Sequence, residues 1–453
     1  MDTRRTAILC SGVTLGVYNP ALIVRNKLRE MGGNPAVFIL ETLFLHDKKN
    51  KIFEMKEMFH RDFRFALMGQ RASKTVGDSY DPFLINELYQ RWLKIGINHF
   101  IVFSGFWMTI LEEYFRTIQQ SNYCVDVYHM DAVESKSWET TEYSVDNIQH
   151  IWFFSAQDQS ISKYLAISNH EIVPFETRYN RYIIHGGGWG IGTYREKIQK
   201  LQAHQLNLDI INYEVRDVTE INPQNRYYMM DPNWKSWEYD VEGNLHFPPF
   251  GEIVADNKTR YRQNNKYPEV YDLIRRNRGI ISKPGGATLL DSLSSATPII
   301  FLEPFGEYER KNAELMIAKG LGIWFHDWEK LSYSTEVIEQ CHRNLVKIRA
   351  ELTEYKEFYK KTFEQGADFN MSIIEKVKII LMEVKSLNVS QANWGHNVSI
   401  IDDIGLDSLQ IINFLLKIED RLNIEIDFEE FNYNHLRSLE KFCGFLKENY
   451  ELS

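Results

Sequence analysis

The predicted fold of this chain is built around residues 280–291. They read Ile280-Ile281-Ser282-Lys283-Pro284-Gly285-Gly286-Ala287-Thr288-Leu289-Leu290-Asp291. The isoleucines end a short apolar strand, the Pro-Gly-Gly segment makes a turn, and a helical pattern starts at Thr288. A glycine turn that opens a helix binds anions, because free backbone N–H groups and the positive end of the helix point at the bound group. We therefore expect Gly285 and Gly286 to hold the diphosphate of a nucleotide. Thr288 can add a hydroxyl, and Asp291 can accept a hydrogen bond from the ribose.

Length and composition exclude several classes of protein. The chain has 453 residues, which predicts two or three domains. A net charge of −10 argues against broad nucleic-acid binding, which depends on a cationic surface. The four cysteines lack metal-ligand spacing, no signal peptide opens the chain, and no apolar run reaches the roughly 20 residues of a membrane span. These features predict a cytoplasmic protein.

The acidic charge is concentrated near the C-terminus. Residues 371–453 hold 8 Lys and Arg against 14 Asp and Glu, a balance of −6, whereas all other residues together carry −4. A short linker at residues 366–370 precedes this segment. An acidic piece behind a linker predicts a separate module.

The chain opens with a βαβ unit, which implies a parallel sheet. A buried strand at residues 7–12 leads through a glycine-bearing loop at 12–20 to a helix at 21–31, and residues 37–40 form the next strand. We place Pro20 in the first turn of the helix, where its missing N–H costs little.

Polar side chains mark the C-terminal ends of two later strands. The strand at residues 100–103 ends at Ser104, and the strand at 124–128 ends at His129 and Asp131. In a parallel sheet these ends line the ligand crevice. His129 and Asp131 are therefore our candidates for a catalytic base, since an unperturbed histidine pKa near 6.5 suits proton transfer at neutral pH. A buried, hydrogen-bonded histidine without a catalytic role is the alternative for His129.

The part of the chain before the acidic module forms its body, and the second half of the body repeats the plan of the first. A strand at residues 182–185 leads to a glycine loop at 186–192 and a helix at 194–203. The loop does not match GxGxxG in register, which argues against a dinucleotide site. An anion cradle that includes Gly187 and Gly188 is the favoured interpretation, and a tight structural turn is the alternative.

Two further expectations concern elements of the second half. Short strands are expected at residues 227–230 and 237–239, in an aromatic, turn-rich region. After residue 324 the pattern is helical, and its longest piece covers residues 337–363.

The acidic module has four helical stretches, at residues 373–387, 408–422, 428–431 and 436–448. The second begins within Gly405-Leu406-Asp407-Ser408-Leu409. By position alone, Ser408 could simply cap its helix.

This module resembles an acyl or peptidyl carrier protein in its Asp-Ser-Leu motif, its order of helices and its acidity. The resemblance implies 4′-phosphopantetheine esterified to Ser408, with a thiol that carries an acyl or aminoacyl group as a thioester. It also implies a phosphopantetheinyl transferase and other carrier-dependent biosynthetic enzymes as partners.

The body resembles a nucleotide-sugar glycosyltransferase of the GT-B architecture, near the MurG-like and antibiotic-type transferases. Three places carry the resemblance: the first loop at residues 16–22, the glycine loop at 186–192, and the core from 285–291 through Asn312-Ala313 to 320–322. It implies an α/β fold with two Rossmann-like domains, followed by the four-helix carrier. The expected domains are an acceptor domain at 1–177, a donor domain at 178–345, a crossing helix and linker at 346–370, and the carrier at 371–453.

The same resemblance assigns roles to the donor-side residues. Gly285, Gly286 and Thr288 would meet the diphosphate, and Asp291 stands where a ribose-binding glutamate is usual. Glu309 and Asn312 stand near the sugar-facing positions of the family. No metal is expected.

The first loop departs from the family at one important position. Gly16, Val17, Tyr18 and Asn19 form its acceptor side, and Val17 stands where many members place a catalytic histidine. Three explanations stay open: another base such as His129 or Asp131, an amine or thiolate acceptor that needs little base, or a body that has lost transfer and kept binding.

Together these features predict an enzyme of specialised natural product biosynthesis. A transferase of the hexosyltransferase class would move a sugar from a nucleotide sugar, such as a UDP-sugar, to an acceptor held on the phosphopantetheine of its own or a partner carrier. Two alternatives remain: transfer to a free acceptor while the carrier serves other enzymes, or a degenerate GT-B scaffold that presents the carrier.

Overall fold

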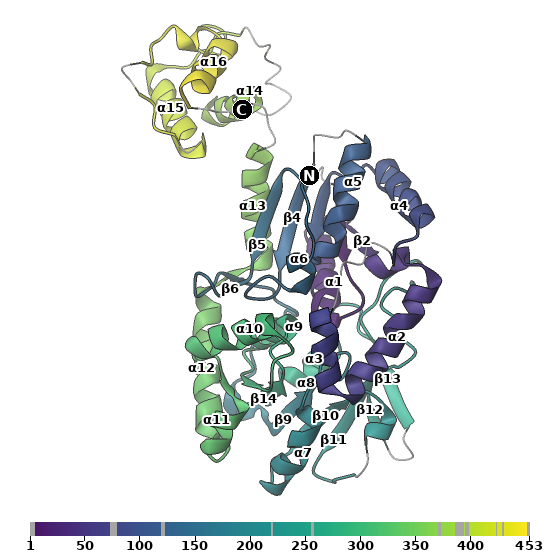
Figure 1. Cartoon of the computed structure of the whole chain (residues 1–453). Helices are drawn as coiled ribbons and strands as arrows, with labels where there is room; N and C mark the ends of the chain where they lie inside the picture. Colours follow the sequence, from purple (N-terminus) through teal and green to yellow (C-terminus); the bar gives the residue numbers. More distant parts are fainter. Residues whose placement is uncertain are drawn as a thin grey trace. The chain divides into compact units, whose positions relative to one another are not determined.

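The structure is a computed structural model that describes residues 5–72, 79–118, 123–218, 221–254, 258–369, 373–385, 394, 398–422, 424–427 and 430–450. The chain divides into two compact units, Met1–Phe358 and Tyr359–Ser453. Figure 1 labels their helices and strands.

A five-stranded parallel sheet forms the first half of the larger unit, in the order β2-β1-β3-β4-β5. Its apolar strands β1, β3 and β4 are almost fully buried, because helices such as α1, α4 and α5 cover the sheet. The bounds are β1 (Thr6–Cys10), β2 (Ala36–Ile39), β3 (His99–Val102), β4 (Cys124–His129), β5 (Ile148–Trp152), α1 (Leu15–Glu30), α4 (Pro82–Ile95) and α5 (Met108–Ile118).

Helix α1 begins six residues earlier than the sequence predicted, at Leu15 and not at residue 21. Pro20 therefore lies inside the helix and not in its first turn. Thr14 is extended, and its carbonyl accepts the Tyr18 N–H at 3.4 Å, so the turn closes ahead of the proline. The predicted acceptor-side residues 16–19 are thus helical and not a loop.

An eight-stranded sheet forms the second half, in the order β13-β12-β11-β10-β9-β14-β15-β16. Its strands are parallel from β11 to β16, and β12 and β13 add an antiparallel hairpin at one edge. The bounds are β9 (Tyr179–His185), β10 (Leu208–Asn212), β11 (Arg226–Met230), β12 (Phe250–Val254), β13 (Lys258–Arg262), β14 (Asn277–Ser282), β15 (Ile299–Phe301) and β16 (Gly322–Trp324). The predicted strand at 237–239 is wrong: these residues belong to a long connection between β11 and β12.

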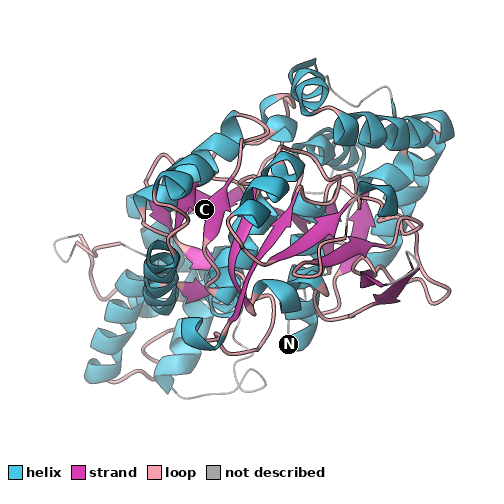
Figure 2. Ribbon diagram, turned by 90° about the horizontal axis from the view of Figure 1, so that it is seen from below, coloured by secondary structure: helices cyan, strands magenta, loops and turns pink. Residues whose placement is uncertain are grey.

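Helices enclose this sheet on both sides, as Figure 2 shows for the whole body. They are α7 (Tyr194–Ala203), α8 (Val270–Ile274), α9 (Gly286–Ser295), α10 (Glu307–Ala318) and α11 (Phe325–Lys330). Helix α1 packs on α9 between the two sheets (Figure 1). Two parallel, Rossmann-like sheets in one unit confirm the predicted α/β class.

The prediction of one helical piece at residues 337–363 is wrong in one respect. The structure has two helices, α12 (Thr335–Glu351) and α13 (Tyr355–Phe369). Between them β17 (Thr353–Glu354) pairs with β8 (Lys163–Tyr164) of the first half. The extended backbone that this pairing requires interrupts the helix.

Two helices of the first half reach the glycine loop of the second. They are α2 (His46–Arg61) and α3 (Phe63–Ala72). His60 Nδ1 lies 3.0 Å from the Gly190 carbonyl, and Phe59 packs on Trp189. The loop at residues 186–192 is therefore part of the contact between the two halves.

The smaller unit is helical. It contains α14 (Ile373–Lys385), α15 (Ser408–Leu422), the short 3-10 helix η8 (His435–Arg437) and α16 (Leu439–Tyr450). Val377, Ile380, Phe414 and Phe442 are fully buried in its core. The helix predicted at residues 428–431 falls partly outside the described residues. No described helix of the chain is long and apolar enough to cross a membrane.

Candidate functional site

Two glycine turns begin side by side at the C-terminal ends of two adjacent central strands of the second sheet. Strands β9 and β14 pair in parallel, with His185 opposite Ser282, and a glycine turn follows each strand. Gly285 is the N-cap of α9, and its carbonyl accepts the Thr288 N–H at 2.9 Å. The first amides of α9 are therefore available to an acceptor from outside the helix.

Asp131, two residues after β4, lies against this helix start. Its Oδ1 accepts a hydrogen bond from Asn312 Nδ2 at 2.7 Å and lies beside Gly286. A Cβ on Gly286 would lie 2.6 Å from the Met130 carbonyl oxygen and 3.0 Å from Asp131 Oδ1. Burial raises the pKa of Asp131 to about 6, although the Asn312 hydrogen bond acts in the opposite direction.

Asn312 ties three segments together. Its fully buried amide also donates to the Pro284 carbonyl at 2.9 Å, and its Oδ1 accepts the Ala132 N–H at 2.6 Å. One side chain of α10 thereby fixes both the turn before α9 and the strand end that carries Asp131.

Lys283 is the functional candidate that the sequence analysis missed. Its ammonium pairs with Glu309, whose other oxygen accepts the Phe305 N–H at 2.6 Å. The Lys283 Nζ lies 3.5 Å from the Cβ position of Gly285, and its Cε lies 3.9 Å from that of Gly187. The positively charged Lys283 ammonium therefore lies between the two glycine turns. The signal was present in the sequence, because a lysine directly precedes Pro284-Gly285-Gly286.

Thr288 and Asp291 lie one turn apart on α9, so both side chains are on one side of the helix. Thr288 is buried, and Asp291 is half-buried. The Asp291 carboxylate has no hydrogen-bond partner among the described residues, and burial raises its pKa to about 8. A partly accessible carboxylate without a partner is suited to bind a ligand hydroxyl.

The glycine loop meets the first half of the body closely. Gly187 has a φ of 71°, which favours glycine, and its N–H donates to His185 Nδ1 at 3.1 Å. A Cβ on Gly188 would lie 2.8 Å from Leu15 Cγ, and one on Gly190 would lie 2.6 Å from His60 Nδ1. Gly188 and Gly190 are thus required by packing between the two halves.

The predicted acceptor-side residues also contact the second half. The Tyr18 hydroxyl donates to the His246 carbonyl at 2.9 Å, and Val17 is half-buried. Nearby, Ser236 Oγ donates to the Gly12 carbonyl at 2.6 Å. The connection at residues 231–249 therefore lies against the start of α1, where Gly16 and Asn19 also lie.

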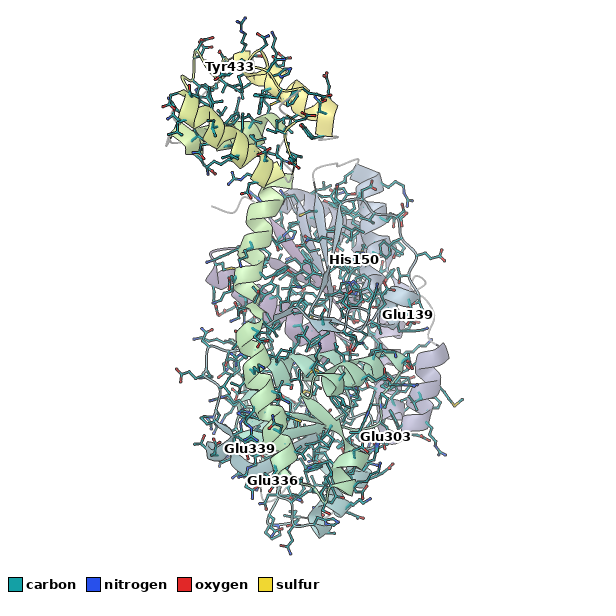
Figure 3. The ribbon with its side chains drawn as sticks, turned by 90° about the vertical axis from the view of Figure 1, so that its left-hand side faces the viewer. Glu139, His150, Glu303, Glu336, Glu339 and Tyr433 are labelled. Carbon is teal, nitrogen blue, oxygen red and sulfur yellow. The ribbon has the colours of Figure 1, made fainter. Side chains whose placement is uncertain are left out.

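The His129 ring is enclosed by other aromatic side chains. It stacks on Trp152 with 3.7 Å between centroids, and its Nε2 lies 2.9 Å from His150 Nδ1. Figure 3 labels His150 within the larger unit. Burial, with the neighbouring His150, lowers the pKa of His129 to about 3. The structure thus groups Asp131, Gly286, Glu309 and Asn312 but holds the His129 ring among aromatic side chains.

One set of side chains has metal-ligand spacing. Ligand atoms of His60, Glu214 and Asp217 all lie within 4.8 Å of one another. Arg195 Nη1 lies 3.5 Å from Asp217 Oδ1 and 3.3 Å from His60 Nε2. Since the guanidinium already supplies positive charge, we interpret this set as an ion-pair network between the two halves.

In the smaller unit the helix cap is Asp407 and not Ser408. Asp407 Oδ1 accepts the Gln410 N–H at 2.8 Å, and Gln410 Oε1 accepts the Asp407 N–H at 3.1 Å, a reciprocal capping box. Ser408 is exposed in the first turn of α15. Its hydroxyl is not needed for the cap and is accessible to modification.

Comparison with known proteins identifies the smaller unit. The family model for a phosphopantetheine attachment site matches residues 387–445. The acyl carrier protein of Buchnera aphidicola subsp. Acyrthosiphon pisum (strain 5A) is 36% identical over 76 residues, which are 17% of this chain and 90% of that protein. That of Nitratidesulfovibrio vulgaris (strain DP4) is 35% identical over 60 residues, which are 13% of this chain and 76% of that protein. In its C-terminal unit, the chain belongs to the acyl carrier protein family.

The chain is also similar to solved glycosyltransferase structures. SnogD from Streptomyces nogalater is 10% identical, covers 80% of this chain and 99% of its own, and has a TM-score of 0.46. SsfS6 from Streptomyces sp. SF2575, complexed with thymidine diphosphate, is 9% identical over 80% of this chain and 100% of its own, with a TM-score of 0.44. MurG from Acinetobacter baumannii is 10% identical over 79% of this chain and 97% of its own, with a TM-score of 0.41. Because these identities and scores are low, we draw the function from the site itself.

Proposed function

We propose that the larger unit is a nucleotide-sugar-dependent glycosyltransferase of the hexosyltransferase class. The observation that carries the proposal is the pair of glycine turns with Lys283 between them, at the C-terminal ends of the adjacent strands β9 and β14. Ligands of Rossmann-like sheets bind at such strand ends. Amides at a helix N-terminus and one cation are suited to the charge of a diphosphate.

The donor would lie along α9. Gly285, Gly286 and Thr288 would contact the diphosphate, with Gly187 on the opposite turn. Asp291 would bind a ribose hydroxyl, since its carboxylate lacks another partner in the described structure. Glu309 and Asn312 would lie on the sugar side, near Lys283 and Asp131.

The reaction would be displacement at the anomeric carbon. The acceptor nucleophile forms a bond to that carbon while the bond to the diphosphate oxygen breaks, and the electron pair leaves with the nucleoside diphosphate. The α9 amides and Lys283 would stabilise the charge that develops on the leaving group. No step requires a metal, because these groups supply the positive charge.

Asp131 is our preferred base for the proton of the nucleophile. Its pKa of about 6 lets it be ionised near neutral pH and still accept a proton. His129 stays a second candidate, but its low pKa and its enclosure by Trp152 and His150 make it a weaker base.

The acceptor would arrive on the carrier. We infer that Ser408 bears 4′-phosphopantetheine and that the acyl or aminoacyl thioester on this arm is the group glycosylated. A phosphopantetheinyl transferase and other carrier-dependent enzymes would be the partners.

The proposed domain boundaries are at residues 177, 345 and 370. A cytoplasmic location is also proposed, because Cys10, Cys341 and Cys443 are buried free thiols.

Intact-protein mass spectrometry tests this function. The phosphopantetheinylated, acyl-loaded chain is incubated with a panel of nucleotide sugars, and we expect a hexose-sized increment on the chain. Ser408→Ala should abolish the increment, and Asp131→Asn should reduce transfer far more than His129→Phe. An increment only on free acceptor would favour the untethered alternative. Absence of nucleotide binding by calorimetry would leave only the scaffold.

A further inference from the structure

The positive groups of the proposed diphosphate site already have internal anionic partners. The Asp131 carboxylate lies against Gly286 at the start of α9, where a Cβ on Gly286 would be 3.0 Å from Asp131 Oδ1, and Glu309 pairs with Lys283. The two carboxylates differ in origin, because Glu309 belongs to α10 beside the turn, whereas Asp131 comes from the first sheet. Only Asp131 links the two halves of the body at this point.

We propose that Asp131 is an internal anion that closes the diphosphate-binding turn, and that a nucleoside diphosphate binds by displacing it from Gly286 and taking Lys283 as counter-ion. This inference rests on the proposed function, and it adds a regulation of the same site. The diphosphate exchanges one anion for another at the same helix start, so binding is a competition and not an addition.

The geometry supports displacement of Asp131 and not of Glu309. Glu309 is 1% exposed and is also held by the Phe305 N–H, so it has little freedom to move. Asp131 is held by a hydrogen bond from Asn312 and by contact with Gly286, both of which belong to the second half. A small separation of the two halves would release it while Lys283 and Glu309 stay in place.

A second buried group between the turns lacks a partner. His185 is 9% exposed, its Nδ1 accepts the Gly187 N–H, and its Nε2 has no hydrogen-bond partner in the described structure. The Nδ1 of the same ring lies 3.4 Å from Ser282 Oγ, at the end of the neighbouring strand β14. An orphaned buried nitrogen beside a cation is the kind of group that a bound phosphate or its water would satisfy.

Charge on Asp131 should therefore oppose donor binding. The charged and titratable groups that face it are Lys283 on the turn, and Tyr308 and Glu309 on α10. Because burial holds the pKa of Asp131 at about 6, the carboxylate is mostly ionised at pH 7.5 and mostly protonated at pH 5. A protonated Asp131 competes less with a diphosphate for the start of α9.

Calorimetric titration of the full chain with UDP and with TDP tests the proposal. Asp131→Asn should bind the better of the two nucleotides at least about tenfold more tightly than the wild type at pH 7.5, since a like charge beside the diphosphate is removed. The ratio of the wild-type and Asp131→Asn dissociation constants should approach one at pH 5. Protonation of the nucleotide affects both proteins equally and therefore cancels in this ratio. Lys283→Met should weaken binding at least about tenfold in either background. Glu139→Gln, at an exposed carboxylate of the first half, is the control for net charge and should leave affinity unchanged.

Hydrogen exchange in the wild-type chain gives a second readout that needs no variant. The Ala132 amide, which donates to Asn312, should exchange faster when UDP or TDP is bound, and the Gly286 amide should exchange more slowly. Wild-type binding with no gain in Asp131→Asn would overturn the internal-anion proposal and leave the donor site standing. Absence of binding by every variant would overturn the proposed function as well.

Discussion

Ionisation of the Asp291 side chain opposes folding. Its carboxylate lacks a partner in the described structure, and burial raises its pKa to about 8. A folded-state pKa above that of the unfolded chain means that the folded protein binds the proton more tightly. Ionisation therefore destabilises the fold progressively as pH rises from about 4 to about 8.

We predict that Asp291→Asn raises the free energy of unfolding at pH 8 by about 1–3 kcal/mol while it weakens nucleotide binding. The gain should shrink toward pH 4, where the unfolded chain is protonated too. Urea denaturation at pH 5 and pH 8 measures the effect, with Asp158→Asn, at an exposed carboxylate, as the matched control. Equal stability of Asp291→Asn and wild type at pH 8 would contradict the prediction.

At the scale of the element, α15 tests whether Ser408 is structural. Asp407 and Gln410 make the reciprocal cap, so Ser408 is available for another role. We predict that Asp407→Ala destabilises the carrier by about 1 kcal/mol, the usual cost of a lost N-cap, whereas Ser408→Ala does not. Faster hydrogen exchange of the first-turn amides of α15 reports the difference. Equal effects of the two variants would make the serine a capping residue after all.

The glycine loop at residues 186–192 is the second informative element. A Cβ on Gly188 would lie 2.8 Å from Leu15 Cγ, so the loop is shaped by its neighbour as well as by a ligand. Gly188→Ala should lower the free energy of unfolding by about 1–3 kcal/mol through overpacking. Adding Leu15→Ala should restore part of this loss, and Gly16→Ala, where a Cβ meets nothing nearer than 3.6 Å, is the control. Additive losses in the double variant would show that the clash is not the cause.

In the intact chain, a carrier unit could deliver its group to the proposed transferase of its own chain or to that of another chain. A short tether holds two modules at an effective concentration on the order of millimolar, provided that they can meet. We predict that a Ser408→Ala chain mixed with a Lys283→Met chain, each at about 1 µM, transfers sugar at under about a tenth of the wild-type rate. Mass spectrometry of the two chains measures this, and full recovery at that concentration would show that carriers serve other bodies as readily as their own.

Several features were predictable because they depend on local sequence. The alternation of strands, glycine turns and helices in both halves follows from apolar periodicity and glycine positions, and the parallel strands of the two sheets confirm it. The strand at 237–239 and the antiparallel β12–β13 hairpin are where the prediction fails. The carrier was predictable from Asp407-Ser408-Leu409 and its acidic surroundings, and the family match at residues 387–445 confirms it. The errors at α1 and β17 arose where a local pattern was overruled, by a helix that closes ahead of Pro20 and by pairing with β8.

Residue order was therefore enough to predict the two Rossmann-like sheets, the glycine turn at Gly285 and the exposed serine of the carrier. Which groups meet at that turn depends on tertiary packing: Asp131 with Gly286 and Asn312, and Lys283 with Glu309. The tertiary structure also encloses the His129 ring between the side chains of Trp138 and Trp152. The physical reason is separation along the chain. Residues 131 and 312 meet only because the segment after β4 packs against α9 and α10, and no local periodicity encodes that contact.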